Sequence, residues 1–123
     1  MKQTFAREAD FQRAAKDLFD LILKPPAFHL HIPNEGKRSK WVGAELKRQG
    51  LLPGAADSLI FLPGGRIICF ELKSESGRMT DGQSDFQALC EACQTPYFVV
   101  RTLAEIEHHL AACGVPTRIR AGL

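Results

Sequence analysis

The stretch from Ile67 to Lys73 constrains this chain most, because it is an apolar run that ends in two charged residues. Its β-branched and aromatic side chains are typical of a strand in the interior of a fold. Glu71 and Lys73 are two residues apart, so in a strand they project from the same face, about 6.7 Å apart. An isolated buried ion is costly, so we expect these two side chains either to pair with each other or to bind something else.

The chain has 123 residues, which predicts one domain over residues 1–123 with a single core. It is 45% hydrophobic and 24% charged, and no apolar run approaches membrane-spanning length, so we expect no membrane association. The first eight residues lack the apolar segment of a secretory signal, and the four cysteines are most simply reduced thiols. Both features favour a cytoplasmic protein, while the net charge of +2 does not by itself identify a nucleic-acid partner.

The first predicted helix runs from about Thr4 to Lys24. Glu8 falls near the middle of its apolar stripe, which consists of Phe11, Ala15, Leu18, Phe19, Ile22 and Leu23. A glutamate in the first turn often only complements the helix dipole in water. Its place on the apolar face favours a functional role for Glu8 instead.

Residues 27–32 alternate in polarity, which predicts a strand. Phe28, Leu30 and Ile32 fall on one face, and His29 and His31 fall on the other. Two histidines at this spacing are able to bind a metal, but they more often form the polar face of a half-exposed strand. We favour the second interpretation.

Residues 33–50 form the basic part of the chain, with a loop that leads into a short helix at about Ser39–Gln49. The cations outnumber the acids Glu35 and Glu45, and they are Lys37, Arg38, Lys40, Lys47 and Arg48. Such a cluster can contact phosphates, and Trp41 could stack on a base or pack against the protein. A charge run of this kind can also be a solvated face only.

Two strands, Ser58–Leu62 and the one that contains Glu71, are separated by Pro63-Gly64-Gly65. Proline suits the first position of a three-residue hairpin loop, and a glycine supplies its left-handed residue. Such a loop pairs Leu62 with Arg66 and places Asp57 opposite Glu71, on the same face. A two-residue loop would place Asp57 on the other face. The sequence favours the longer loop, and so predicts that Asp57, Glu71 and Lys73 converge.

Two carboxylates that lie close together repel each other unless a proton or a cation sits between them. Their oxygens suit Mg²⁺ or Mn²⁺ rather than zinc. A neighbouring lysine can hold or deprotonate a water molecule, or stabilise charge on a phosphate. The combination indicates metal-assisted hydrolysis of a phosphodiester, and no small-molecule organic cofactor is expected.

Thr80-Asp81-Gly82-Gln83 is a capping box that begins a helix to about Gln94. Gln83 therefore has a capping role, a role at the site, or both. The apolar stripe of this helix is Phe86, Leu89, Cys90 and Cys93. Both thiols are predicted on the core face, where small buried cysteines are common, so zinc or redox chemistry is disfavoured.

Residues 97–100 are a continuous apolar run that predicts a buried strand reached by a βαβ crossover. A final helix is predicted from the capping box at Thr102 to about Cys113, followed by a short tail at residues 115–120, as a possible edge strand. The predicted fold class is α/β, with a small mixed sheet, a central hairpin and helices on both faces.

The pattern Gly54-x-x-Asp57, a hairpin and Glu71-x-Lys73 resembles the PD-(D/E)xK nuclease superfamily. A fuller set of matches resembles its VRR-NUC family: Glu8-x-x-x-Gln12, Asn34-Glu35-Gly36-Lys37-Arg38, Gly50-Leu51-x-Pro53-Gly54 and Gly77-Arg78-Met79-Thr80-Asp81-Gly82-Gln83. One departure is Ala56, which stands where the superfamily name places a proline. The resemblance implies a restriction-endonuclease-like core and a metal-dependent DNA endonuclease.

The resemblance also implies a role for each site residue. Asp57 and Glu71 would bind Mg²⁺ or Mn²⁺ together with the backbone carbonyl of Leu72, and Glu8 would reach the metal through water. Lys73 would position or activate the attacking water, and Gln83 would complete the site.

The expected partner is DNA. The candidate phosphate contacts are Lys37, Arg38, Lys40 and Arg78. The resemblance implies a homodimer that acts on branched DNA such as the four-way Holliday junction. Two alternatives stay open: a nucleic-acid-binding module on the same fold with little or no turnover, and a structural protein in which these charges only pair.

Overall fold

The computed structural model describes residues 3–33 and 40–118, and within these ranges it contains four helices and four strands. This confirms the predicted α/β class. In chain order the elements are α1 (Glu8–Ile22), β1 (Phe28–His31), α2 (Lys40–Arg48), β2 (Ser58–Leu62), β3 (Arg66–Leu72), α3 (Asp81–Ala92), β4 (Tyr97–Val100) and α4 (Leu103–Ala112).

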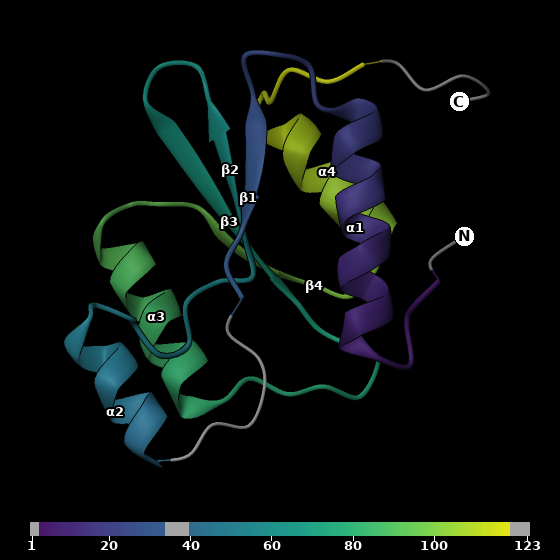
Figure 1. Ribbon diagram of the computed structural model, residues 1–123. Coiled ribbons are helices and arrows are strands. Elements are labelled where there is room, and N and C mark those ends of the chain that lie inside the picture. The colour runs from purple at the N-terminus through teal and green to yellow at the C-terminus, as the bar shows by residue number, and fades with distance from the viewer. Residues whose placement is uncertain (1–2, 34–39, 119–123) are drawn as a thin grey trace.

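The four strands form one mixed sheet in the order β1-β2-β3-β4. The first three strands are antiparallel, and β4 lies parallel to β3 after the α3 crossover. Helices α1 and α4 lie together on one face of this sheet and α3 lies on the other (Figure 1). The mixed sheet, its central hairpin and the βαβ unit are therefore as predicted.

The loop of the central hairpin has the three residues that the sequence predicted. Leu62 lies opposite Arg66, and both glycines of the loop have positive φ angles, 86° at Gly64 and 71° at Gly65. The register continues to the pair Ser58 and Phe70. One residue further along each strand, Asp57 and Glu71 face each other on the same side of the sheet.

The main core lies between the sheet and the helices α1 and α4. All six predicted apolar residues of the first helix are buried there, together with residues such as Phe70, Ile106 and Leu110. The predicted helix bounds were too wide, because α1 begins at Glu8 and ends at Ile22. Arg7 before it is extended, and Leu23 after it forms a β-bridge with Thr117, so neither end continues the helix.

Strand β1 is largely exposed on both faces, so the prediction of a covered apolar face is wrong. Phe28 and Leu30 are 55% and 48% exposed, whereas the ring of His29 packs on Phe19 of α1 with 5.2 Å between centroids. His29 Nε2 also lies 2.9 Å from Asp20 Oδ1. His31 is exposed, as expected for the polar face of a half-exposed strand, whereas His29 is partly buried against α1. Because β1 is the outer strand beside α1, its histidines contact polar side chains of that helix. Phe28 instead stacks on Phe61 of the neighbouring strand β2.

Helix α3 covers its face of the sheet along a narrow contact only. Cys90 is buried against Ala56 and Cys69, but Cys93 is exposed and Leu89 is 53% exposed. The prediction that both thiols of the Cys-x-x-Cys pattern face the core is wrong for Cys93. The helix ends at Ala92 with Cys93 as its C-cap, and residues 91–94 are all exposed, so the sheet does not cover Cys93.

The segment after α4 forms no strand within the part that the structure describes. It makes a single bridge between Thr117 and Leu23, with hydrogen bonds to Ile22 and Lys24 on either side. The predicted edge strand over residues 115–120 is therefore wrong for residues 115–118, and the last two lie outside the described residues. Over the described ranges, no helix is long and apolar enough to span a bilayer.

Candidate functional site

Five of the predicted site residues come together at the ends of four different segments. Glu8 begins α1 and Asp57 precedes β2. Glu71 lies near the end of β3, Lys73 directly follows this strand, and Gln83 lies in the first turn of α3. Lys73 is central: its Nζ donates to Gln83 Oε1 at 2.7 Å and lies 3.6 Å from Glu71 Oε2 and 3.9 Å from Glu8 Oε2. Lys73 and Glu71 are only 3% and 1% exposed. The cluster therefore has a buried centre at the end of an apolar strand, with Glu8 at its more exposed edge, where the side chain is 43% exposed.

Asp57 is held in this cluster by its backbone and by its side chain. Its Oδ2 accepts a hydrogen bond from the N–H of Leu72 at 2.8 Å. Its carbonyl oxygen accepts from the N–H of Ile32 at 2.8 Å and from His31 Nδ1 at 2.8 Å. These bonds fix the carboxylate on the same face as Glu71 in the register that the hairpin sets.

Gln83 has both roles that the sequence left open. Its Oε1 accepts from the N–H of Thr80 at 2.9 Å, and its own N–H donates to Thr80 Oγ1, which completes the capping box. The same Oε1 accepts from Lys73, while Nε2 donates to Glu71 Oε2 at 3.0 Å. The start of α3 therefore orients both charged residues of β3.

The carboxyl group of Glu71 has an unusual environment. Burial raises its pKa, and the negative charge of Asp57 and a hydrogen bond with the Asp57 carboxyl raise it further. Lys73 opposes this effect only in part, so the pKa of Glu71 rises to about 9. Its Oε1 is buried and receives no hydrogen bond from a nitrogen or hydroxyl donor among the described residues. Without a cation, Glu71 is therefore protonated at neutral pH.

These residues fit a small divalent cation. An unsatisfied carboxylate oxygen next to a second carboxylate is a place where a hard cation can replace a proton. Within the described ranges, no three or more side chains of His, Cys, Asp and Glu form a group able to hold a metal. Asp57 and Glu71 would therefore supply two ligands, with the backbone and water for the rest, as is usual for Mg²⁺.

A cavity of about 280 Å³ adjoins the cluster on the side of α1. Its walls are Glu8, Ala9, Gln12, Arg13 and Asp57. Both Glu8 and Asp57 thus line open space as well as the cluster. Arg13 stands at the outer wall, where its side chain is 68% exposed and pairs with Asp10. The cavity therefore makes both acidic residues accessible from one side of the molecule.

Gly54 sets the distance between the segment before Asp57 and the start of α3. Its φ is +80°, and an added Cβ would lie 2.2 Å from both the backbone C and O of Gly82 and 2.5 Å from the N of Gln83. Only a glycine allows this approach of two backbones. The close contact between Gly54 and Gly82 therefore brings together the segment that leads to Asp57 and the helix start that carries Gln83.

Two residues near the site were missed in the sequence. His31, interpreted as an exposed face residue, supports the Asp57 carbonyl. Tyr97, counted only as part of an apolar run, has a buried hydroxyl without a hydrogen-bond partner among the described residues. Burial raises the pKa of Tyr97, and the charges of Glu71 and Asp57 raise it further. Tyr97 lies two residues before Val99, which pairs with Glu71. Because residues two apart in a strand share a face, this spacing places Tyr97 on the same face of the sheet as Glu71.

The structure places the candidate DNA contacts on exposed segments. Lys40 begins α2, and Arg78 lies in the connection between β3 and α3. Neither side chain forms a hydrogen bond or ion pair with another described residue. Lys37 and Arg38 lie outside the described residues, so the structure gives no position for them.

Comparisons of the chain with protein-family models, with curated proteins and with solved structures found no match.

Proposed function

We propose that this protein is a divalent-metal-dependent DNA endonuclease that hydrolyses phosphodiester bonds. The observation that carries the proposal is the buried cluster of Asp57, Glu71 and Lys73, in which one carboxylate oxygen is unsatisfied and the pKa of Glu71 is raised to about 9. A strongly perturbed carboxyl beside a specific charged partner and a cavity is typical of a functional site. The mixed sheet with its central hairpin supports a restriction-endonuclease-like core of the VRR-NUC kind, as the motifs suggested.

Asp57 and Glu71 would hold Mg²⁺ or Mn²⁺, with the Leu72 carbonyl as a further ligand and Glu8 acting through water. When bound, such an ion supplies Lewis acidity toward a phosphate oxygen and lowers the pKa of a coordinated water. Lys73 would orient the attacking water and stabilise charge on the phosphate. Gln83 fixes the Lys73 amine by accepting its hydrogen bond, so it keeps this cation aimed at the site.

The decisive experiment is cleavage of labelled four-way junction, flap and linear duplex DNA with Mg²⁺ or Mn²⁺. Wild-type protein should cut, whereas Glu71→Gln and Lys73→Met should lose about 100-fold or more of the rate. These variants keep the size of the side chain. The matched controls Glu91→Gln and Lys16→Met change exposed residues and should leave the rate unchanged.

Each other outcome of this experiment excludes the proposal in a different way. Cleavage that survives both site variants would mean a contaminant or another site. DNA binding without cleavage by the wild type would favour the binding module without turnover. Neither binding nor cleavage would leave a protein in which the charges have only a structural role.

We also propose a homodimer that acts on branched DNA, since two symmetric sites would let each subunit cut one strand. Sedimentation of the protein with and without junction DNA tests this. A monomer in both samples at the concentration at which cleavage occurs would exclude the dimer without affecting the metal site.

A further inference from the structure

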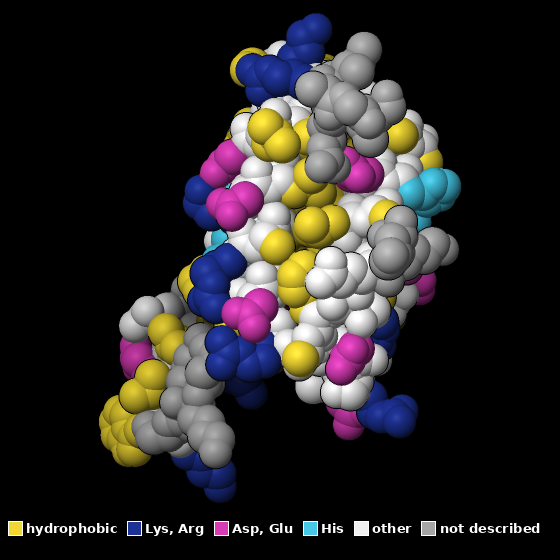
Figure 2. Space-filling model, turned by 90° about the vertical axis from the view of Figure 1, so that its right-hand side faces the viewer, with side chains coloured by type: hydrophobic (Ala, Val, Ile, Leu, Met, Phe, Trp, Pro, Cys, Tyr) yellow, Lys and Arg dark blue, Asp and Glu magenta, His cyan; other side chains and the backbone are white. Residues whose placement is uncertain are grey.

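Helix α2 stands apart from the core of the molecule. None of its nine residues is buried, whereas α1, α3 and α4 each bury at least one. In Figure 2 hydrophobic and basic side chains gather on a lobe at the lower left, where this helix lies. Only Gly43 and Leu46 of this helix are half-buried among the described residues, and the other seven are exposed. An amphipathic helix with so little of its surface covered has a face available for a partner.

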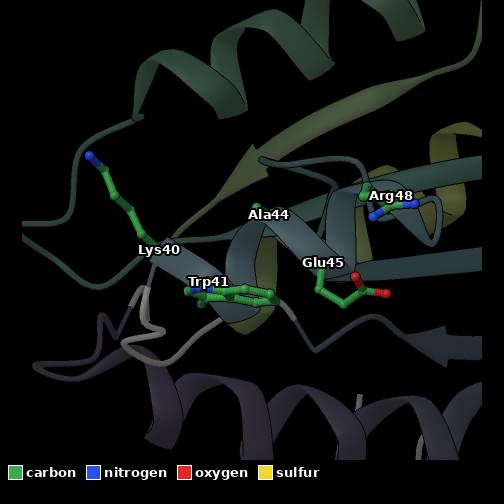
Figure 3. Close-up of a pocket in the computed structure, with 5 residues that line it drawn as sticks. All are labelled: Lys40, Trp41, Ala44, Glu45 and Arg48. Carbon is green, nitrogen blue, oxygen red and sulfur yellow. The ribbon is translucent and has the colours of Figure 1, made fainter.

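Trp41 is the most exposed large hydrophobic residue on this helix, at 82%. It is also the only tryptophan in the chain. Its ring forms part of a hollow of about 320 Å³ that is lined by Lys40, Trp41, Ala44, Glu45 and Arg48 (Figure 3). The small side chain of Ala44 leaves the space beside the indole open. An exposed indole face beside such a hollow can accept a flat aromatic ligand.

The charges around this hollow indicate what kind of ligand it takes. Lys40 and Arg48 stand at its two ends, about 12 Å apart along the helix axis, and Lys47 is next to Arg48. The only acid on the helix is Glu45, whose carboxylate already accepts from Gln49 Nε2 at 3.0 Å. Neither Lys40 nor Arg48 has an ion-pair partner within the part of the chain that the structure describes. The surface therefore pairs an aromatic face with two cations that no acid among the described residues pairs with.

We propose that this face of α2 binds an unpaired segment of a nucleic-acid strand. One base would stack on Trp41 above Ala44, and Lys40 and Arg48 would contact phosphates on either side. Aromatic stacking flanked by cations is the usual way in which single strands are held without regard to sequence. We choose nucleic acid over a protein partner because the two cations at the ends of the hollow match the repeated negative charge of a phosphate backbone.

The proposal rests on the proposed function for its substrate, since a nuclease that also held an unpaired strand would favour branched DNA that contains one. Binding itself needs neither Asp57 nor a metal, so it can be measured with chelator present. A protein that binds single strands but never cuts would exclude the nuclease and keep this surface. A protein that cuts DNA but binds single strands equally well without Trp41 would support the nuclease and exclude this binding surface.

The test is a titration of metal-free, full-length protein with short oligothymidylate. Because Trp41 is the only tryptophan, quenching of intrinsic fluorescence reports directly on stacking at this residue. In anisotropy measurements with a labelled strand, Trp41→Ala should weaken binding between about fivefold and about 100-fold. Trp41→Phe should restore part of the affinity. Leu21→Ala, at a residue 60% exposed on α1, is the matched control and should change nothing.

Salt dependence separates the phosphate contacts from the stacking. Arg48→Gln should lower the slope of log affinity against log salt by about 0.7, whereas Trp41→Ala should leave the slope unchanged. Wild-type affinity in Trp41→Ala, or no fluorescence change on saturation, would overturn the proposal. Fluorescence that instead shifts with protein concentration alone, together with a dimer in sedimentation, would assign this face to a second copy of the chain and also overturn it.

Discussion

The carboxylate of Asp57 accepts a hydrogen bond from the backbone N–H of Leu72, with 2.8 Å between Oδ2 and N. Leu72 stands between Glu71 and Lys73, so this bond joins the segment before β2 to the end of β3 that carries both charges. The Asp57 carboxyl also lies close enough to Glu71 to raise the pKa of that side chain. The electrostatic properties of the site follow from this approach of two acids in a buried place.

Stability without metal should depend on pH through Glu71. The pKa of this carboxyl rises from its ordinary value of 4.5 to about 9 in the folded protein. Between these values the folded state keeps a proton that the unfolded state has released, so the contribution of Glu71 to the free energy of unfolding falls as pH rises. We expect a fall of more than about 1.4 kcal/mol, the equivalent of one pKa unit. Denaturant melts in chelator across this range measure it.

The control for this prediction is Glu71→Gln, which keeps the shape of the side chain but has no proton to lose. The difference in stability between variant and wild type should grow as pH rises toward 9. Parallel pH profiles for the two proteins would show that Glu71 does not titrate in this way.

Binding of Mg²⁺ or Mn²⁺ should release a proton at neutral pH. Glu71 is protonated there in the metal-free protein, and a cation ligand must be deprotonated. Titration calorimetry in buffers of different ionisation enthalpy should therefore give about one proton released per ion. Glu71→Gln should bind weakly and release none. Metal uptake by the wild type with no proton release would contradict the protonated state of Glu71 beside Asp57 in the metal-free protein.

Gln83→Leu should remove activity for a reason that is separate from helix capping. It breaks the bond to Thr80 and also the contacts with Lys73 and Glu71. Glu105 has the equivalent capping position at the start of α4, where it accepts from the N–H of Thr102 at 3.1 Å. Glu105→Leu should lose about 1 kcal/mol of stability, and Gln83→Leu should lose more, because it also takes a hydrogen-bond partner from the buried Lys73 and Glu71.

Only Gln83→Leu should lower cleavage, by about 100-fold, because only Gln83 orients groups in the site. Rates measured under saturating metal, with denaturant melts of both variants, separate the two effects. An equal loss of cleavage in Glu105→Leu would mean that stability alone explains the result.

Gly54→Ala should be more harmful than the same change at Gly64. The two residues have similar φ angles, +80° and +86°, but a Cβ at Gly64 meets open space, whereas at Gly54 it would overlap Gly82. Gly64→Ala should cost about 1 kcal/mol through backbone strain alone. Gly54→Ala should cost at least about 2 kcal/mol more, since the start of α3 must move. Equal losses in thermal or chemical melts would show that the Gly54 contact is loose.

Some of the site could be read from local sequence chemistry. The turn Pro63-Gly64-Gly65 determines the hairpin register, and that register puts Asp57 opposite Glu71. The alternation of side chains along β3 places Lys73 on the same face, and the capping box places Gln83 in the first turn of a helix. These inferences held because each depends on contacts between residues close in sequence or joined by one short loop.

Other features were decided by packing between distant segments. The alternation in β1 was read correctly, but which face is covered depended on the position of α1, where Asp20 and Phe19 receive His29. The exposure of Cys93 depended on where α3 leaves the sheet.

The stretch from Ile67 to Lys73 by itself determined that an acid and an amine share one face of a buried strand. Only the tertiary structure decided the protonation state of the acid. Burial of Glu71 removes water from its carboxyl, and Asp57, 14 residues earlier in the sequence, adds a second negative charge beside it. Desolvation and like-charge repulsion act through space and vary with the depth of burial, so no pattern along the chain specifies them.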